Sequence, residues 1–311
     1  MTGKPLAGVF PIVATPFRSD AAPDFEDFAR LVDFIVVAGA DGVVFPGVAS
    51  EFETLQPDER RLLVEAVAKA VGARVPLVVG VSASNATDAA SYAAHARSVG
   101  ALAVMAVAPP SMRDESQAQV EYYRRIAAEG LPVILQNAPP PAGCGFVPER
   151  VAQIVAAIPG IDYVKEETLP CGQRITQLLA LLPGRLKGVF GGAGGRYITD
   201  ELARGACGTM PACELTDLHV AQFAAHRAGD SAEVRRLFNR MLPLLNFQAV
   251  FRMAMTKEVL RRRGVIGATY VRAAGPTLDA GDLRELDALL DDVSDLLPRN
   301  AGSDPEIRPN T

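Results

Sequence analysis

The chain has 311 residues, of which 49% are hydrophobic and 22% are charged, and its formal net charge at pH 7 is -5. This composition is typical of a globular protein with a large core and excludes a chain that is disordered throughout. The acidic balance, without any block rich in lysine or arginine, provides no basic surface for nucleic acid or for a membrane. We therefore expect a small-molecule partner.

The chain carries no pattern typical of export or of a membrane span. Its longest apolar run, residues 101–110, is far shorter than the roughly 20 residues that span a bilayer. Residues 1–5 lack the basic and apolar regions of a secretory signal, so we expect a cytoplasmic protein. The 4 cysteines show neither a C-x-x-C pair nor zinc-ligand spacing, and we predict no disulfide, no metal ion and no cofactor.

Eight short β-rich or apolar runs recur along the first two thirds of the chain. They are Gly8–Val13, Gly42–Phe45, Pro76–Val81, Leu102–Val107, Pro132–Leu135, Asp162–Val164, Leu186–Phe190 and Gly208–Met210. Segments with helical spacing separate them, and Pro57 and Pro148 fit the first turns of two such helices. Alternating strands and helices indicate parallel pairing. Eight such units predict an α/β fold, the (β/α)8 barrel; an open doubly wound sheet is the alternative, but no G-x-G-x-x-G follows the first strand.

The pattern becomes purely helical after residue 216. Helices are expected near Asp217–Arg227, Ser231–Leu245, Ala249–Arg263 and Ala280–Leu297. We therefore predict a barrel over residues 1–216 and a helical C-terminal extension over residues 217–297. Residues 298–311 are rich in Pro, Asn and Asp and are predicted to form a mobile tail.

One lysine lies where a barrel carries its chemistry, at the carboxyl end of a strand. The chain has only five lysines: Lys4, Lys69, Lys165, Lys187 and Lys257. Lys165 follows the sixth predicted strand and should point into a narrow apolar mouth. Desolvation there would lower its pKa and free the amine to attack a carbonyl. The alternative is a purely structural ion pair with Glu166 or Glu167.

Two turns rich in small residues follow other strands. The turn Gly47–Glu51 lets a ligand approach the backbone, and its amide N–H groups could hold a carboxylate. A carbonyl-reactive lysine that faces a carboxylate site indicates a 2-oxo acid as the ligand. The run Gly191–Gly195 could admit a phosphate or a hydroxylated tail. An ordinary strand-to-helix loop is the alternative for each turn.

These features together resemble the dihydrodipicolinate synthase/N-acetylneuraminate lyase family of class I aldolases, along nearly the whole chain. The resemblance rests on Pro11–Phe17, the G-x-x-x-E turn at Gly47–Glu51 and the lysine within Val164-Lys165-Glu166. It implies that Lys165 forms a Schiff base with pyruvate or another 2-oxo acid. It also implies a homo-oligomer, a tetramer or a dimer.

The chain departs from the family pattern around this lysine. Val48 and Ala49 replace two threonines of the turn, and Gln136 occupies the place of the tyrosine that relays protons beside the lysine. The basic residue that the synthases use for aspartate semialdehyde is Pro141 here. A glutamine is not an acid or a base near neutral pH, so another proton carrier is required. The run Gln136–Pro139 resembles the 2-keto-3-deoxy-sugar-acid dehydratase branch, particularly enzymes similar to 2-keto-3-deoxyarabonate dehydratase.

We therefore predict a Schiff-base lyase that dehydrates a 2-keto-3-deoxy sugar acid. Lys165 attacks the C2 carbonyl, the iminium acidifies C3, and the resulting enamine expels the C4 hydroxyl. The predicted catalytic residues are Lys165, Glu51 and Gln136. The predicted substrate-binding residues are Ala49, Ser50, Asn137, Gly191, Gly192, Pro211 and Glu214.

Several alternatives stay open at this point. One alternative is that Glu51 only anchors its loop and that Glu214 only begins the helix after the eighth strand. An aldolase would break the C3–C4 bond from the same iminium, and a synthase-like activity is a further alternative. A non-catalytic barrel that binds a 2-oxo acid is an alternative of a different class.

Overall fold

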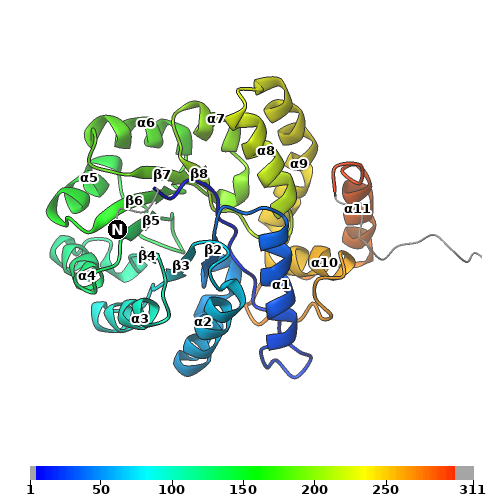
Figure 1. Cartoon of the computed structure of the whole chain (residues 1–311), viewed down its shortest axis with the longest axis horizontal. Coiled ribbons are helices and arrows are strands. Elements are labelled where there is room, and N and C mark those ends of the chain that lie inside the picture. Colours follow the sequence, from blue (N-terminus) through cyan, green and yellow to red (C-terminus); the bar gives the residue numbers. More distant parts are fainter. Residues whose placement is uncertain (1–4, 298–311) are drawn as a thin grey trace, which may run out of the picture.

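A computed structural model describes residues 5–297 as a ring of parallel strands surrounded by helices (Figure 1). The strands are β1 (Gly8–Val9), β2 (Val43–Phe45), β3 (Leu77–Gly80), β4 (Ala103–Val107), β5 (Val133–Asn137), β6 (Ile161–Glu166), β7 (Gly188–Gly191) and β8 (Gly208–Thr209). The predicted tail, residues 298–311, lies outside the described residues. None of the helices within residues 5–297 has the length and apolar character to cross a membrane.

The strands pair in the order β1-β8-β7-β6-β5-β4-β3-β2, and every pair is parallel. Ile12, just beyond β1, bridges both Val44 of β2 and Ala212 beyond β8, which brings the two ends of the sheet together. The predicted (β/α)8 barrel is thereby confirmed. Strand β6 extends two residues beyond the predicted Val164, so Lys165 lies within the strand and is held by its ladder.

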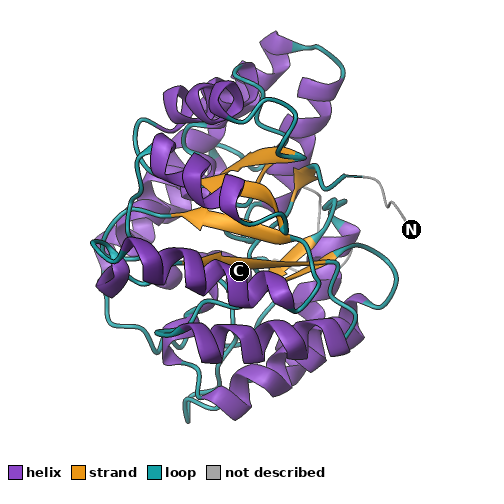
Figure 2. Ribbon diagram, turned by 90° about the vertical axis from the view of Figure 1, so that its left-hand side faces the viewer, coloured by secondary structure: helices purple, strands orange, loops and turns teal. Residues whose placement is uncertain are grey.

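Seven helices connect the strands of the barrel. They are α1 (Phe25–Val37), α2 (Pro57–Val71), α3 (Ala86–Ser98), α4 (Ser116–Ala128), α5 (Pro148–Ala157), α6 (Cys171–Leu181) and α7 (Ile198–Ala203). Pro57 and Pro148 begin α2 and α5, as their fixed φ favours. Figure 2 shows the strands in orange, enclosed by these helices.

The barrel has an inner and an outer apolar core, because alternate residues of each strand face opposite ways. The inner core is filled by the side chains of Leu6, Phe10, Ile12, Val44, Val78, Ala103, Met105, Ile134, Tyr163, Phe190 and Met210. Val164, next to Tyr163 on β6, packs instead in the outer core against the helices. Position along a strand therefore decides whether a side chain faces the barrel interior or the helix layer.

Four further helices follow the barrel: α8 (Thr216–Arg227), α9 (Ser231–Phe251), α10 (Met253–Arg262) and α11 (Ala280–Asp291). They share a separate apolar cluster that includes Leu218, Leu244 and Leu286. The helix predicted to end at Leu245 continues to Phe251, because the break is made by the backbone of Arg252, with φ 47° and ψ -121°.

A buried ion pair joins this extension to the barrel. Lys257 of α10 donates to the Glu51 carboxylate, with 2.5 Å between Nζ and Oε1, and both side chains are fully buried. The other oxygen of Glu51 accepts the backbone N–H groups of Arg272 and Ala273, each at 2.7 Å. The turn after β2 is thereby fastened to a segment more than 200 residues away.

Removing the cation should destabilise the protein strongly. The substitution Lys257→Met leaves the Glu51 carboxylate buried without its charged partner, which costs about 3–5 kcal/mol. Urea denaturation followed by circular dichroism measures the change in the free energy of unfolding. The control Lys69→Met removes an exposed lysine of α2 and should change it by less than about 0.5 kcal/mol. A loss below about 1 kcal/mol for Lys257→Met would show that the pair does not anchor the extension.

Candidate active site

At the ends of β5 and β6, alternate polar residues face the barrel interior and the helix layer. Gln136 pairs with Lys165 in the parallel register, and Asn137 pairs with Glu166. Gln136 and Lys165 lie one alternation beyond the inner-core residues of their strands, so they face the interior of the barrel mouth. Asn137 and Glu166 face the helix layer for the same reason.

Lys165 is almost completely buried and forms an ion pair with Glu167. Its Nζ lies 3.2 Å from Glu167 Oε1. Gln136 Nε2 donates to Glu167 Oε2 at 2.6 Å, and the N–H of Ala193 donates to Oε1 at 3.0 Å. Burial raises the pKa of the Glu167 carboxyl. The charge of Lys165 and the hydrogen bonds from Gln136 and the Ala193 amide lower that pKa by more, so it lies below its usual value. Glu167 is therefore ionised beside the lysine.

Glu166 takes part in a separate network on the outer side of the barrel. Its Oε2 accepts from Asn137 Nδ2 at 2.8 Å, and Arg174 of α6 lies 3.3 Å from its Oε1. Asn137 also exchanges two hydrogen bonds with the backbone of Phe146. The predicted substrate ligand Asn137 therefore holds the loop after β5 and does not line the cavity beside Lys165.

Lys165, Gln136 and Glu167 line a cavity of about 270 Å³ at the mouth of the barrel. The predicted residue Ala49 lines it as well, together with Val48. These two residues open a short 3-10 helix, Val48–Ser50, and their N–H groups have no acceptor within residues 5–297. Free amides at a helix start suit a carboxylate.

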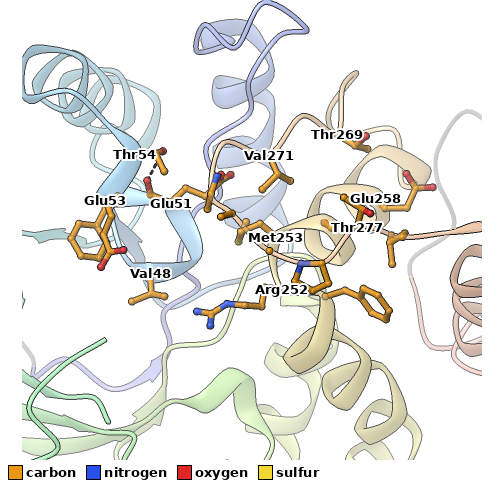
Figure 3. Close-up of a pocket in the computed structure, with 18 of the residues that line it drawn as sticks. Val48, Glu51, Glu53, Thr54, Arg252, Met253, Glu258, Thr269, Val271 and Thr277 are labelled. Carbon is orange, nitrogen blue, oxygen red and sulfur yellow. Dashed lines mark hydrogen bonds between the residues drawn. The ribbon is translucent and has the colours of Figure 1, made fainter. Parts of the chain in front are cut away.

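A second cavity of about 630 Å³ lies between the loop after β2 and the C-terminal extension (Figure 3). Val48, Arg252 and Met253 line both cavities, so they form the boundary between them. Glu51 lines only the outer cavity, and its carboxylate is occupied by Lys257 and by two backbone amides. Glu51 is therefore separated from the lysine that it was predicted to assist.

The other predicted ligands lie behind the wall of the inner cavity. The Ser50 hydroxyl donates to the Val13 carbonyl and accepts from the Gly47 N–H, and the Ser50 N–H donates to the Gly47 carbonyl. Pro211 is flanked by the lining residues Met210 and Ala212 but does not itself line the cavity. Glu214 is fully buried beside α10, and burial raises its pKa to about 7.

Gly191, at the end of β7, and Gly192, which follows it, make room for two carboxylates. A Cβ on Gly192 would lie 2.5 Å from Glu167 Oε1, and a Cβ on Gly191 would lie 2.0 Å from Glu201 Oε2. Glu201, on α7, thus lies behind the strand on the side opposite Lys165. Gly191 and Gly192 were predicted to contact substrate, yet neither lines the inner cavity, whereas Ala193 and Gly194 do.

Four polar residues that line the inner cavity were given no role toward the substrate by the sequence: Glu167, Arg196, Gln248 and Arg252. Glu167 was considered only as a structural ion-pair partner of Lys165, and the structure does contain that pair. For Glu167 the signal was present, because a residue two positions after Lys165 on a strand faces the same side. The two arginines and Gln248 had no comparable signal. Gln248 and Arg252 reach the mouth only through the packing of the extension.

The buried carboxyl of Glu201 should make stability depend on pH. Burial, and then the charges of Glu167 and Asp200, raise its pKa from 4.5 to about 8. Above pH 4.5 the unfolded chain releases this proton while the folded protein keeps it, so this group's contribution to stability falls as pH rises to about 8. The isosteric Glu201→Gln should remove that loss. Relative to the wild type, its free energy of unfolding should therefore be higher at pH 8.5 than at pH 5 by on the order of 4 kcal/mol.

Guanidinium denaturation at both pH values measures this difference. The exposed Glu285→Gln is the control and should give the wild-type pH dependence. Equal pH dependence in Glu201→Gln and the wild type would contradict the interpretation of Glu201 as a buried, protonated acid.

Comparison with known proteins identifies the family to which the chain is similar. Residues 5–292 match the dihydrodipicolinate synthetase family. The chain is 31% identical to a 4-hydroxy-tetrahydrodipicolinate synthase of Stenotrophomonas maltophilia, over 91% of this chain and 98% of that protein. It is 28% identical to an L-2-keto-3-deoxyarabonate dehydratase of Azospirillum brasilense, over 91% of this chain and 93% of the relative.

The fold of the chain also matches that of a solved structure. The crystal structure of a dihydrodipicolinate synthase from Rhodopseudomonas palustris superposes with a TM-score of 0.86 at 28% identity, and covers 92% of this chain and 97% of the other. The family resemblance seen in the sequence is therefore confirmed. The chain belongs to the dihydrodipicolinate synthetase family, whose members are lyases that bind small molecules.

Proposed function

We propose that this protein is a Schiff-base-forming lyase that dehydrates a 2-keto-3-deoxy sugar acid. The observation that carries the proposal is the Glu167 carboxylate, 3.2 Å from Lys165 Nζ and 2.6 Å from Gln136 Nε2. It places an ionised acid beside the amine, in a barrel mouth where Gln136 stands for the family's tyrosine. Glu167 carries the protons, because Gln136 is neither an acid nor a base near neutral pH.

The first step forms the iminium. Lys165 passes a proton to Glu167 and attacks C2 of the 2-oxo acid, while the amides of Val48 and Ala49 hold the substrate carboxylate. Glu167 returns that proton to the C2 oxygen, takes a second proton from the nitrogen and passes it to the C2 hydroxyl, which leaves as water as the iminium forms. The carboxylate ends this step ionised, ready for the next.

The second step removes water from C3 and C4. The iminium withdraws electrons, so Glu167 takes a proton from C3 and an enamine forms. The enamine pushes out the C4 hydroxyl, which receives the proton from Glu167 and leaves as a second water. The C3–C4 double bond then moves to C4–C5 as C5 loses a proton and C3 gains one, so that the C5 hydroxyl becomes an enol and then a carbonyl, which is an aldehyde in a five-carbon acid. Gln136 holds Glu167 in place throughout, and hydrolysis of the iminium consumes one water and releases the dioxo acid and the Lys165 amine.

The dehydratase of Azospirillum brasilense supports this reaction, since it shares nearly the full length of the chain. The relatives named as synthases favour a different function, that of a carbon–carbon lyase that uses the same iminium. Glu51, Asn137 and Glu214 take supporting roles in this proposal, because each is bound to neighbouring structure outside the inner cavity. Assembly as a homo-oligomer and a cytoplasmic location stay predictions.

Borohydride trapping tests the Schiff base. Pyruvate and borohydride should add a reduced pyruvyl group to Lys165, which peptide mass spectrometry locates, and Lys165→Arg should not be labelled. Wild-type protein without an adduct would exclude every Schiff-base reaction and leave the non-catalytic barrel. Products from a panel of 2-keto-3-deoxy acids then separate the two lyases: a 2-oxo semialdehyde indicates dehydration, and pyruvate with an aldehyde indicates aldol cleavage.

The role of Glu167 is tested by Glu167→Gln, which keeps the shape but removes the base. We expect kcat for dehydration to fall by about 10²- to 10⁴-fold, the usual contribution of a positioned acid–base group. The matched control is Glu201→Gln, a buried carboxyl on the other side of the same glycine loop, for which kcat should stay within a few-fold. A Glu167→Gln enzyme with kcat within a few-fold of the wild type would assign the proton transfer to another group.

A further inference from the structure

The two sides of the inner cavity differ in polarity. Strands β7 and β5 flank β6, which carries Lys165, so the loops after them line the cavity on opposite sides of the lysine. The loop after β7 holds the Glu167 carboxylate through a backbone N–H and is followed by Arg196, which also lines the cavity. The loop after β5 contributes residues 138–142, whose sequence is Ala-Pro-Pro-Pro-Ala. The side of β7 is therefore polar and the side of β5 is apolar.

The apolar side offers no hydrogen-bond donor over residues 139–142. Pro139, Pro140 and Pro141 have no backbone N–H. The N–H of Ala142 already donates to the Pro139 carbonyl at 3.1 Å, and none of the four side chains has a polar atom. The three prolines are exposed and Ala142 is half-buried. An apolar group that covers them removes apolar surface from water, whereas a hydroxyl placed there loses water and gains no donor.

The loop after β5 is held in one position. Asn137 Nδ2 donates to the Phe146 carbonyl at 3.0 Å, and Asn137 Oδ1 accepts from the Phe146 N–H at 2.9 Å, so this side chain closes the loop. The Gly145 N–H donates to the Ala138 carbonyl at 3.0 Å. A Cβ on Gly143 would lie 2.6 Å from the same carbonyl oxygen, which shows how closely the backbone folds back on itself. These contacts prevent the loop from turning a donor toward a ligand.

The proposed mechanism decides which part of the substrate meets this loop. C2 is bonded to Lys165, and the C1 carboxylate is held by the amides of Val48 and Ala49, beyond β2 and across the ring from β6. The C4 hydroxyl is turned toward Glu167, on the side of β7. Because C4 is tetrahedral, C5 is directed away from that hydroxyl, toward the side of β5. The last carbon of a six-carbon acid therefore meets residues 139–142.

We propose that the last carbon of the substrate is a methyl group that packs against residues 139–142. The substrate is then a six-carbon 2-keto-3,6-dideoxy sugar acid, with hydroxyls on C4 and C5 and none on C6. Loss of one water gives a 2,5-dioxo acid, in which the C5 carbonyl is a ketone. This inference rests on the proposed function and narrows its substrate class.

The test compares three 2-keto-3-deoxy acids of the same configuration: a five-carbon acid, and two six-carbon acids that end in a methyl or a hydroxymethyl group. Wild-type kcat/KM should be at least about 10-fold higher for the methyl acid than for the hydroxymethyl acid, since an apolar site rejects an added hydroxyl by up to about 10². The five-carbon acid, which has no C6, should lie between them. A hydroxymethyl acid used as well as the methyl acid, or better, overturns the proposal.

The substitution Ala142→Ser adds a hydrogen-bond donor to the apolar side. It should lower the preference for the methyl acid by about 2- to 10-fold, the contribution of one hydrogen bond between neutral groups. The matched control is Ala249→Ser, which adds the same hydroxyl to the same cavity from α9. Ala249 follows Gln248, whose Oε1 would lie 3.4 Å from a Cβ on Gly194 in the loop after β7, so the control should keep the wild-type preference.

Trapping of pyruvate distinguishes the possible failures. Pyruvate has no carbon beyond C3, so Ala142→Ser should trap it on Lys165 as the wild type does, which shows that the variant is folded. A wild-type protein that traps no pyruvate overturns the proposed function and the methyl preference with it. A trapping wild type without the methyl preference overturns this inference alone, as does an Ala142→Ser variant that traps pyruvate and keeps the wild-type preference.

Discussion

The carboxylate of Glu167 is the contact on which the site depends. Three donors converge on it, from β5, from β6 and from the loop after β7. Each donor comes from a different strand-to-helix unit, so the contact forms only when neighbouring strands are in register. It also requires Gly192, because a side chain there would occupy the space of the carboxylate. The register of the strands and the position of a carboxylate beside Lys165 thus depend on the same contact.

The barrel separates chemistry from support by alternation along its strands. Lys165 and Gln136 face the interior, whereas Glu166 and Asn137, their immediate neighbours, face the helices and hold a loop. Adjacent polar residues therefore make unrelated contacts. A deletion of one residue early in β6 would exchange the two layers and put the wrong carboxylate beside the cavity.

The sequence predicted the eight strands and the place of Lys165 at the end of the sixth, because both follow from local periodicity and from the rule that barrel chemistry lies at the strand ends. The catalytic role of Lys165 stays a prediction. The sequence was less informative about ligands. Asn137 was predicted to bind substrate, but the strand continues through it, and its position turns it outward. Glu51 could not be interpreted locally, since its partner Lys257 lies 206 residues away. The position of Arg252 depends on a backbone break that no residue pattern signals.

The inner cavity takes part of its wall from α9 and α10, through Gln248, Arg252 and Met253. A nascent chain therefore carries Lys165 and its partners long before it carries a complete mouth. Until α9 and α10 have been synthesised, the cavity beside Lys165 lacks both this wall and the ion pair that Lys257 makes with Glu51. The cavity proposed to bind the substrate is thus completed late in synthesis, after Lys165 and Glu167 have been synthesised.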